Sequence, residues 1–355
     1  MNGGVGGTKR PYDTLRKVLG PIAAPFYGAV IASRNRRFDG GVGVVRVPLP
    51  VISVGNLTTG GTGKTPFVMW LCRELMARGV KPAIAMRGYG SEKNNGRSDE
   101  AEEYRAAMPH VPVIVNPDRH AGITALLRGG GAADVIVLDD GFQHRRLHRD
   151  VDIVLVDAQA ATPSDRLLPA GDLREPVTSI ARAGIVVLTH AEKADAADST
   201  ERALRPYLAQ DTVVARASHR WTDLAVNDAG ADTTWRVPWL RGKHVVAVCG
   251  IARPSGFLQT LGESGCKVQE VFGLRDHQPI DAALAERVAR TAVEKKAQII
   301  VTTQKDYARM GDAPGEWSRL TVVRPLLTLD VQPSEALVTR IVSAIGAGRG
   351  VTAPA

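Results

Sequence analysis

The chain has 355 residues, of which 44% are hydrophobic and 23% charged, and its formal net charge is +8. This composition predicts a globular protein of about two domains and excludes a disordered or fibrous chain. No segment contains the ~20 consecutive apolar residues of a membrane-spanning helix, which excludes a protein that crosses the bilayer by helices. Three separated cysteines without a CxxC pair favour reduced thiols in the cytosol over a disulfide framework.

The N-terminal segment combines positive charge with apolar residues. Residues 1–46 contain eight Lys and Arg against two Asp, and so carry six of the eight net positive charges. Apolar residues recur there mostly at intervals of three or four, at Leu15, Val18, Leu19, Ile22, Phe26 and Val30. An apolar stripe flanked by basic clusters is typical of a segment that lies on an anionic membrane surface. We therefore expect residues 1–45 to be membrane-associating helices, and Pro21 and Pro25 predict two short helices rather than one.

An apolar stripe of this kind is also compatible with roles away from a membrane. The stripe could instead pack on the protein's own core. A cleaved signal peptide is disfavoured, because the apolar run ends in Arg34, Arg36 and Arg37 without a small-residue cleavage site. Aromatic residues interleaved with a basic stripe, as in single-stranded nucleic acid binding, are absent, so nucleic acid is not an expected partner.

From residue 46 onward, short β-branched runs alternate with helical stretches, which predicts an α/β fold with parallel strands joined by helices. The expected strands cover 51–54, 83–86, 113–115, 135–138, 153–156 and 185–188, and they are apolar on both faces, as in a sheet covered by helices on both sides. We expect a domain at 46–216, a β-hairpin-like linker at 217–241, a second and smaller α/β/α domain at 242–346, and a disordered tail at 347–355.

The segment after the first expected strand carries the strongest chemical signal. Residues 51–65, VISVGNLTTGGTGKT, pass from an apolar strand through a Gly-rich turn into an expected helix at 66–78. This is the context of a phosphate-binding loop, whose backbone N–H groups hold phosphate oxygens. Lys64 is expected to neutralise the β and γ oxygens, and the Thr65 hydroxyl to reach Mg²⁺. The expected nucleotide-binding residues are Thr58, Thr59, Gly60, Gly61, Thr62, Gly63, Lys64 and Thr65, although the strict GxxxxGK[ST] pattern would place Gly where this chain has Thr58.

Two carboxylates end the strand expected at 135–138, in the sequence VIVLDDGFQH. Ligands bind beyond the carboxyl ends of parallel strands, and an enzyme with a phosphate loop needs a carboxylate there to hold Mg²⁺. Asp139 and Asp140 are therefore expected in the catalytic site, with Asp139 as a metal ligand. His144 and His148 have the spacing of zinc ligands on a helix, but no nearby Cys or Glu completes such a site. We expect Gln143 and His144 to contact substrate instead.

At this point the chain resembles the tetraacyldisaccharide 4'-kinase family. Five motifs in order carry the resemblance: SVGNLTTGGTGKTP at 53–66, RGYG at 87–90, DDGFQHRRLHRD at 139–150, LLPAGDLREP at 167–176 and TQKD at 303–306. The similarity covers about residues 10–340. It implies a P-loop NTPase-type domain joined by a β-linker to a second α/β/α domain, and an N-terminal helix in the membrane surface.

The resemblance also implies a reaction, which is transfer of the γ-phosphate of ATP, with Mg²⁺, to the 4'-hydroxyl of the lipid A disaccharide 1-phosphate. This would place the protein on the cytoplasmic face of the inner membrane of a Gram-negative bacterium, against anionic lipids. An Asp and a His that take the acceptor's proton match Asp99 and His277 here, although Ser98 and Ala101 replace the Gly and Pro of the family's GDEP, so Asp276 or Asp140 could substitute for Asp99. Glu175 is expected to help bind Mg²⁺, and Arg119 and Arg174 to contact phosphate groups.

Two other functions share part of this pattern. A P-loop ATPase switch that rides on membranes would use the same loop, carboxylates and amphipathic N-terminus, but it does not predict RLHRD, LLPAGDLREP or a second domain that carries a histidine. A soluble small-molecule kinase does not require the basic apolar stripe.

Overall fold

The computed structural model describes residues 13–88, 98–160, 164–228, 230–251, 254–274, 278, 280–310, 315–317 and 319–348. The chain divides into two compact units, which are Met1–Ser218 with Leu329–Ala355 (unit 1) and His219–Thr328 (unit 2). The chain passes from one unit to the other along two long strands, β7 (Val213–Asp228) and β12 (Thr321–Gln332). None of the helices in the described ranges is long and apolar enough to cross a membrane.

Unit 1 is built on a parallel sheet in the order β7-β6-β5-β1-β4-β2-β3. The strands are β1 (Val51–Asn56), β2 (Pro82–Met86), β3 (Val113–Val115), β4 (Val135–Asp139), β5 (Val151–Asp157), β6 (Ile185–Thr189) and the first part of β7. The strands predicted in this region all form, and every pairing among them is parallel. Because β1 lies between β4 and β5, the segments that follow these three strands meet at one edge of the sheet.

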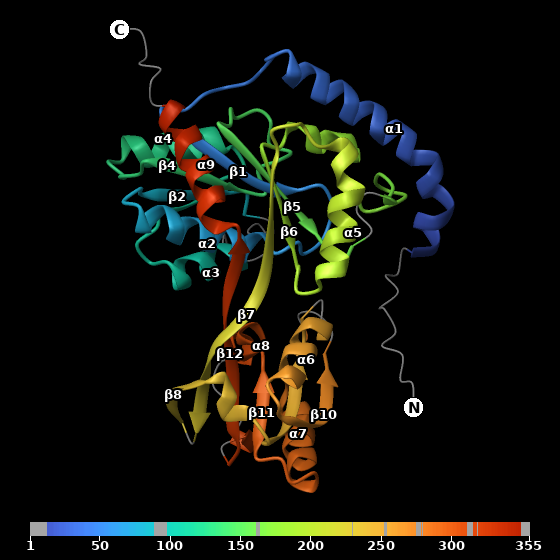
Figure 1. Ribbon diagram of the computed structural model, residues 1–355, viewed down its shortest axis with the longest axis vertical. Coiled ribbons are helices and arrows are strands. Elements are labelled where there is room, and N and C mark those ends of the chain that lie inside the picture. Colours follow the sequence, from blue (N-terminus) through green and yellow to red (C-terminus); the bar gives the residue numbers. More distant parts are fainter. Residues whose placement is uncertain are drawn as a thin grey trace. The chain divides into compact units, whose positions relative to one another are not determined.

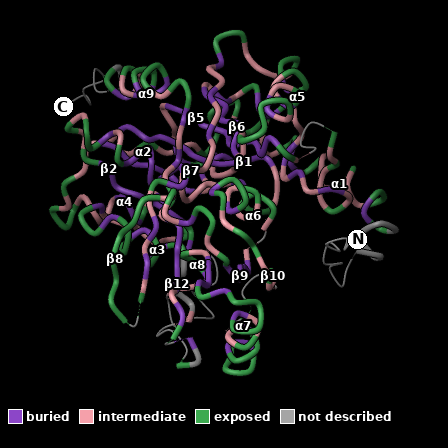
Figure 2. Tube along the Cα trace, turned by 60° about the horizontal axis from the view of Figure 1, so that its bottom comes forward, coloured by how far each residue is buried: buried purple, intermediate pink, exposed green. Residues whose placement is uncertain are grey.

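Helices cover both faces of this sheet (Figure 1). Alternate strand residues enter different cores: Ile52 and Val54 of β1 pack in one cluster, whereas Val51 packs in another on the opposite face. The first face is covered by α2 (Lys64–Ala77), α3 (Asp99–Ala107) and α9 (Ser334–Gly348), and the second by α4 (Arg119–Arg128), α5 (Ala194–Leu204), η2 (Val177–Arg182) and η3 (Arg205–Tyr207). The residues of the central strands are therefore almost all buried, as Figure 2 shows for β1 and β5.

The strands of unit 2 follow the order β10-β9-β11-β12-β7, with β8 paired to β7. Its elements are β8 (Ala231–Arg236), η4 (Val237–Leu240), β9 (His244–Cys249), α6 (Pro254–Glu263), β10 (Lys267–Gly273), α7 (Ala282–Glu294), β11 (Ile299–Thr302), α8 (Gln304–Met310) and η5 (Gly315–Trp317). β7 and β8 form an antiparallel hairpin at the position where the sequence predicts a hairpin-like linker.

The C-terminal helix differs from the expected domain boundary. Residues 329–346, assigned from the sequence to the second domain, group with unit 1. Leu337, Val338 and Ile341 of α9 are fully buried in the same cluster as α2 and the central strands. The sequence pattern shows that this helix has an apolar face but not which core receives it.

The N-terminal segment also differs from the expectation of two short helices. α1 (Asp13–Asp39) is one continuous helix that contains Pro21 and Pro25. Each proline removes one backbone hydrogen bond, which normally breaks a helix. Here, tertiary contacts along α1 compensate: Gly20 packs closely against the backbone of Ala170, and Ile31 is 6% exposed.

Candidate active site

The glycine-rich loop connects β1 to α2 and is shaped by two left-handed residues. Gly60 has φ 112° and Gly63 has φ 74°, conformations that favour glycine, and α2 begins directly afterwards at Lys64. The loop therefore presents the N-terminus of a 14-residue helix, where free N–H groups and the helix dipole favour an anion. Thr62 is buried, and its hydroxyl has no hydrogen-bond partner among the residues that the structure describes.

A second segment, from the LLPAGDLREP motif, lies along the start of this loop. The Thr59 N–H donates to the carbonyl of Asp172 (2.8 Å), and the Thr59 hydroxyl donates to Asp172 Oδ1 (3.0 Å). Thr58 and Leu173 form an antiparallel bridge. These contacts explain why Thr58 can stand where the strict pattern has glycine: an extended residue paired in a bridge needs no left-handed conformation.

Three charged side chains meet beside the loop. Arg174 donates two hydrogen bonds to Asp140, at 2.8 and 3.0 Å, and Lys64 Nζ lies 3.5 Å from Asp140 Oδ1 and 3.4 Å from Asn56 Oδ1. Burial alone raises the pKa of Asp140, but the charges of Lys64 and Arg174 outweigh it and lower that pKa below its ordinary value. Asp140 is therefore ionised near neutral pH and holds both cations at the phosphate loop.

Asp139 lies in a different environment, although it is the adjacent residue. Its side chain is buried, the Tyr104 hydroxyl donates to its Oδ2 (3.0 Å), and its Oδ1 has no hydrogen-bond partner in the described part of the chain. Burial raises the pKa of Asp139 to about 6, with a further contribution from the negative charge of Glu100, and the charge of Lys64 opposes this shift. Tyr104 also contacts the Thr65 side chain, which places Thr65 and Asp139 around one hydroxyl group.

The raised pKa of Asp139 makes a prediction about stability. Between pH 4 and 6 the unfolded chain releases the Asp139 proton while the folded chain keeps it. The free energy of unfolding therefore falls as pH rises through this range, and the full loss of stability is reached above pH 6. Asp139→Asn should therefore be more stable than the wild type at pH 7.5 by roughly 2–3 kcal/mol and nearly equal to it at pH 4. Urea titration of both proteins without nucleotide or metal, at several pH values, measures the difference between their free energies of unfolding. The contributions of histidines that titrate in the same range are common to both proteins and cancel in this difference. A pH-independent difference would contradict the assignment.

Gln143, His144 and Arg119 lie around the segment that follows Asp140. Gln143 Nε2 donates to the carbonyl of Asn56 (2.9 Å), which holds the end of β1. His144 is half-buried, and burial, together with the charges of Arg119 and Arg149, lowers its pKa to about 4, so it is neutral near pH 7. Arg119 is buried at the start of α4 and donates to the carbonyl of Pro117 (3.1 Å). In the structure Gln143 holds the end of β1, and the charge of Arg119 acts on His144.

Glu175 has a different environment from the one expected of a Mg²⁺ ligand. It is fully buried, accepts hydrogen bonds from Arg182 (2.9 Å) and Asn35 (2.8 Å), and lies 3.5 Å from Arg34 Nη2. Its carboxylate therefore joins α1 to the core. No cluster of three or more His, Cys, Asp or Glu side chains suited to a metal occurs within the described ranges. The structure thus shows Glu175 paired with side chains of α1 and η2, and the predicted Mg²⁺ ligands Glu175, Asp139 and Thr65 stay predictions.

The expected catalytic dyad falls largely outside the described residues. Asp99 begins α3, but its side chain is not described, and His277 and its neighbour Asp276 lie outside the described ranges. The TQKD motif is described within unit 2: Asp306 is buried and accepts hydrogen bonds from Thr303 Oγ1 (2.6 Å) and the Gly250 N–H (2.8 Å). This motif ties the end of β11 to the end of β9.

Sequence reasoning missed the contribution of α3. Tyr104 and Glu100 both act on Asp139, one by a hydrogen bond and one by its charge. Their spacing of four places them on one face of a helix, which was a detectable signal. Asn56, at the end of β1, was also missed as a contact of Lys64.

The parallel sheet, the glycine-rich loop entering α2 and the carboxylates that end β4 define a nucleotide-binding protein of the P-loop class. Comparison with known proteins narrows this class. The model of the family described as "Tetraacyldisaccharide-1-P 4'-kinase" matches residues 15–345, so the chain belongs to this family and is a kinase.

Individual relatives agree with the family match. A tetraacyldisaccharide 4'-kinase of Anaeromyxobacter dehalogenans is 37% identical over 319 residues, covering 85% of this chain and 83% of the relative. One of Geobacter sulfurreducens is 35% identical over 344 residues, covering 90% and 92%. Among solved structures, LpxK of Aquifex aeolicus in complex with ATP superposes with a TM-score of 0.68 at 28% identity, covering 93% of this chain and 99% of that one. The predicted family, fold class and kinase activity are therefore confirmed.

Proposed function

We propose that this kinase transfers the γ-phosphate of ATP to the 4'-hydroxyl of the lipid A disaccharide 1-phosphate, a late step of lipid A biosynthesis. The observation that carries the proposal is the phosphate loop with Lys64, Asp140 and Arg174 held together beside it, in a chain of this family. The curated relatives are named for the tetraacyldisaccharide substrate, and the similar solved structure contains ATP.

In the proposed reaction the described residues have different roles. Lys64 and the N–H groups at the start of α2 stabilise negative charge on the transferring phosphoryl group. Arg174 and Asp140 keep Lys64 in place. The unpartnered Oδ1 of Asp139 and the neighbouring Thr65 hydroxyl fit a hard oxygen-seeking cation, and would hold Mg²⁺. When bound, Mg²⁺ neutralises charge on the phosphate oxygens. Arg119 and neutral His144 are proposed to contact the substrate.

The acceptor hydroxyl is a weak nucleophile and needs a base, for which we propose Asp99 and His277. His277→Ala should lower kcat by about 10²-fold, the scale of general-base catalysis, and change the KM for ATP little. Steady-state kinetics with both substrates varied separates the two parameters. An effect confined to the KM for ATP would remove His277 from the dyad.

The reaction is tested directly by supplying γ-labelled ATP, Mg²⁺ and purified lipid A disaccharide 1-phosphate in detergent micelles, with a control that lacks the acceptor. We expect a labelled lipid that depends on both substrates. Label that appears only as free phosphate, at a rate independent of lipid, would refute the proposal and favour a membrane-bound ATPase switch.

We further propose that α1 lies on the anionic, cytoplasmic surface of the inner membrane. Leu19, Ile22, Phe26 and Val30 are 50, 66, 75 and 66% exposed, so this stripe does not pack on the protein's own core. Their spacing places them on one side of α1, and basic residues occupy its last turn. Leu15 and Val18, the other residues of the predicted stripe, have side chains outside the described set.

A triple variant tests this surface. Ile22→Ser, Phe26→Ser and Val30→Ser together should lower binding to vesicles of anionic phospholipid at least about 10-fold, because each apolar side chain contributes on the order of 1.5–3 kcal/mol when buried. The melting temperature should change little, since these side chains are exposed. Val293→Ser on α7 removes a side chain that is 70% exposed and should bind vesicles normally. Equal flotation of the triple variant and this control would contradict the proposal.

A further inference from the structure

α1 is anchored to the segment that lines the phosphate loop. Gly20 and Gly28 pack closely against Ala170 and Leu167, and the Tyr27 hydroxyl donates to the carbonyl of Arg174 (2.8 Å). One turn beyond Ile31, Asn35 Nδ2 donates to Glu175 Oε2 (2.8 Å). Tyr27 and Asn35 of α1 therefore hold Arg174 and Glu175, two consecutive residues of the LLPAGDLREP motif. They do so from a side of the helix different from the exposed apolar stripe.

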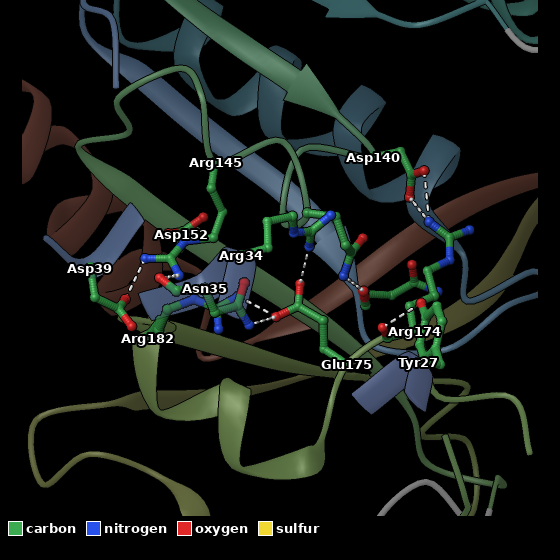
Figure 3. A network of polar contacts seen from close by, with 12 residues as sticks. Tyr27, Arg34, Asn35, Asp39, Asp140, Arg145, Asp152, Arg174, Glu175 and Arg182 are labelled. Atoms are coloured by element: carbon green, nitrogen blue, oxygen red, sulfur yellow. Dashed lines mark hydrogen bonds and ion pairs between the residues drawn. The ribbon is translucent and has the colours of Figure 1, made fainter. Parts of the chain in front are cut away.

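The Arg174 held in this way is the residue that holds Asp140. Its backbone is fixed on one side by Tyr27 and on the other by the Arg174 N–H, which donates to the carbonyl of Leu57 (2.7 Å). Its guanidinium forms the two hydrogen bonds to Asp140, and Asp140 lies 3.5 Å from Lys64. Figure 3 shows this route from Tyr27 through Arg174 to Asp140. Only Arg174 and Asp140 therefore lie between Tyr27 and the catalytic Lys64 in this chain of contacts.

A second contact reaches the other side of the site. Arg145, six residues after Asp139, is buried, donates to the carbonyl of Asn35 (3.0 Å) and pairs with Asp39 at the end of α1 (2.6 Å). The segment that carries Asp139 and Asp140 and the segment that carries Arg174 are therefore both attached to the same stretch of α1, as Figure 3 shows. Asn35 lies at the centre, since its side chain meets Glu175 and its carbonyl meets Arg145.

We propose that Tyr27 and Asn35 of α1 are positioning residues for phosphoryl transfer, which hold Arg174 and hence Asp140 and Lys64 in their reactive arrangement. This rests on the proposed kinase reaction but adds residues outside its five sequence motifs.

Hydrogen exchange of the full chain tests the coupling without substrate. In the double variant Tyr27→Phe, Asn35→Ala, backbone amides of residues 166–175 should exchange about 10-fold faster than in the wild type, since two hydrogen bonds to this segment are lost. Ser33→Ala, at an exposed position of the same helix, should exchange as the wild type does. Unchanged exchange at 166–175 in the double variant overturns the proposal, whatever the kinase assay gives.

Kinetics then separate positioning from stability. Tyr27→Phe should lower kcat about 3- to 10-fold at a temperature well below its melting point, with the KM for ATP within about twofold of the wild type. Asn35→Asp and Glu175→Gln should each lower kcat further, whereas the two together exchange donor and acceptor in place and should recover most of it. A loss of melting temperature at full kcat would show a purely structural role. Absence of labelled lipid in the wild type would instead refute the proposed function and leave the exchange result to decide the coupling.

Discussion

Replacing Lys64 with alanine should lower phosphoryl transfer by about 10³-fold, because a cation placed where charge develops contributes several kcal/mol in a partly buried site. Lys64 is the first residue of α2, and its Nζ is held by Asp140 and Asn56 rather than by packing. The variant should therefore fold normally. Initial rates with the lipid acceptor and thermal melting of the same preparation provide the two measurements.

The outcome is informative in both directions. Lys295→Ala, which removes an exposed lysine at the end of α7, is the matched control and should retain wild-type kinetics. Near-normal turnover of Lys64→Ala would overturn the phosphate-loop assignment. Loss of folding would show instead that the fold requires the charge of Lys64 beside Asp140, in addition to that of Arg174.

Glu175→Ala should be among the most destabilising single substitutions in unit 1. The carboxylate is fully buried between Arg182, Asn35 and Arg34, and its removal leaves two partly buried guanidinium groups without their counter-charge. Breaking a buried pair in this way costs about 3–5 kcal/mol, which corresponds to a fall of roughly 10 °C in melting temperature for a unit of this size. Thermal melting without nucleotide or metal measures it.

This prediction also decides between two roles for Glu175. Activity is expected to fall in both cases, but a residue that only binds Mg²⁺ would keep its stability without metal, whereas a structural anchor would lose it. Glu102→Ala provides the control, since the Glu102–Arg105 pair is exposed and such pairs contribute only about 0–1 kcal/mol. A melting temperature within about 2 °C of the wild type would return Glu175 to the candidate metal ligands.

Features specified by residues that are adjacent in the chain could be predicted from the sequence. The six strands of the first domain and the glycine-rich loop were predicted at nearly the observed positions, because a buried parallel strand needs a continuous apolar run and a left-handed turn needs glycine. Asp139 and Asp140 were predicted together, yet their environments differ: one is buried against Tyr104, and the other is paired with Lys64 and Arg174.

The sequence by itself determined the α/β fold class, the phosphate loop, the carboxylates at the end of β4 and the family, since each depends on residues that are close together in the chain. Only the tertiary structure decided the rest. It made α1 one helix despite Pro21 and Pro25, assigned α9 to unit 1, turned Glu175 toward α1 and brought Tyr104 to Asp139. These outcomes depend on contacts between residues 35 to 140 or more positions apart, whose free energy no local pattern contains.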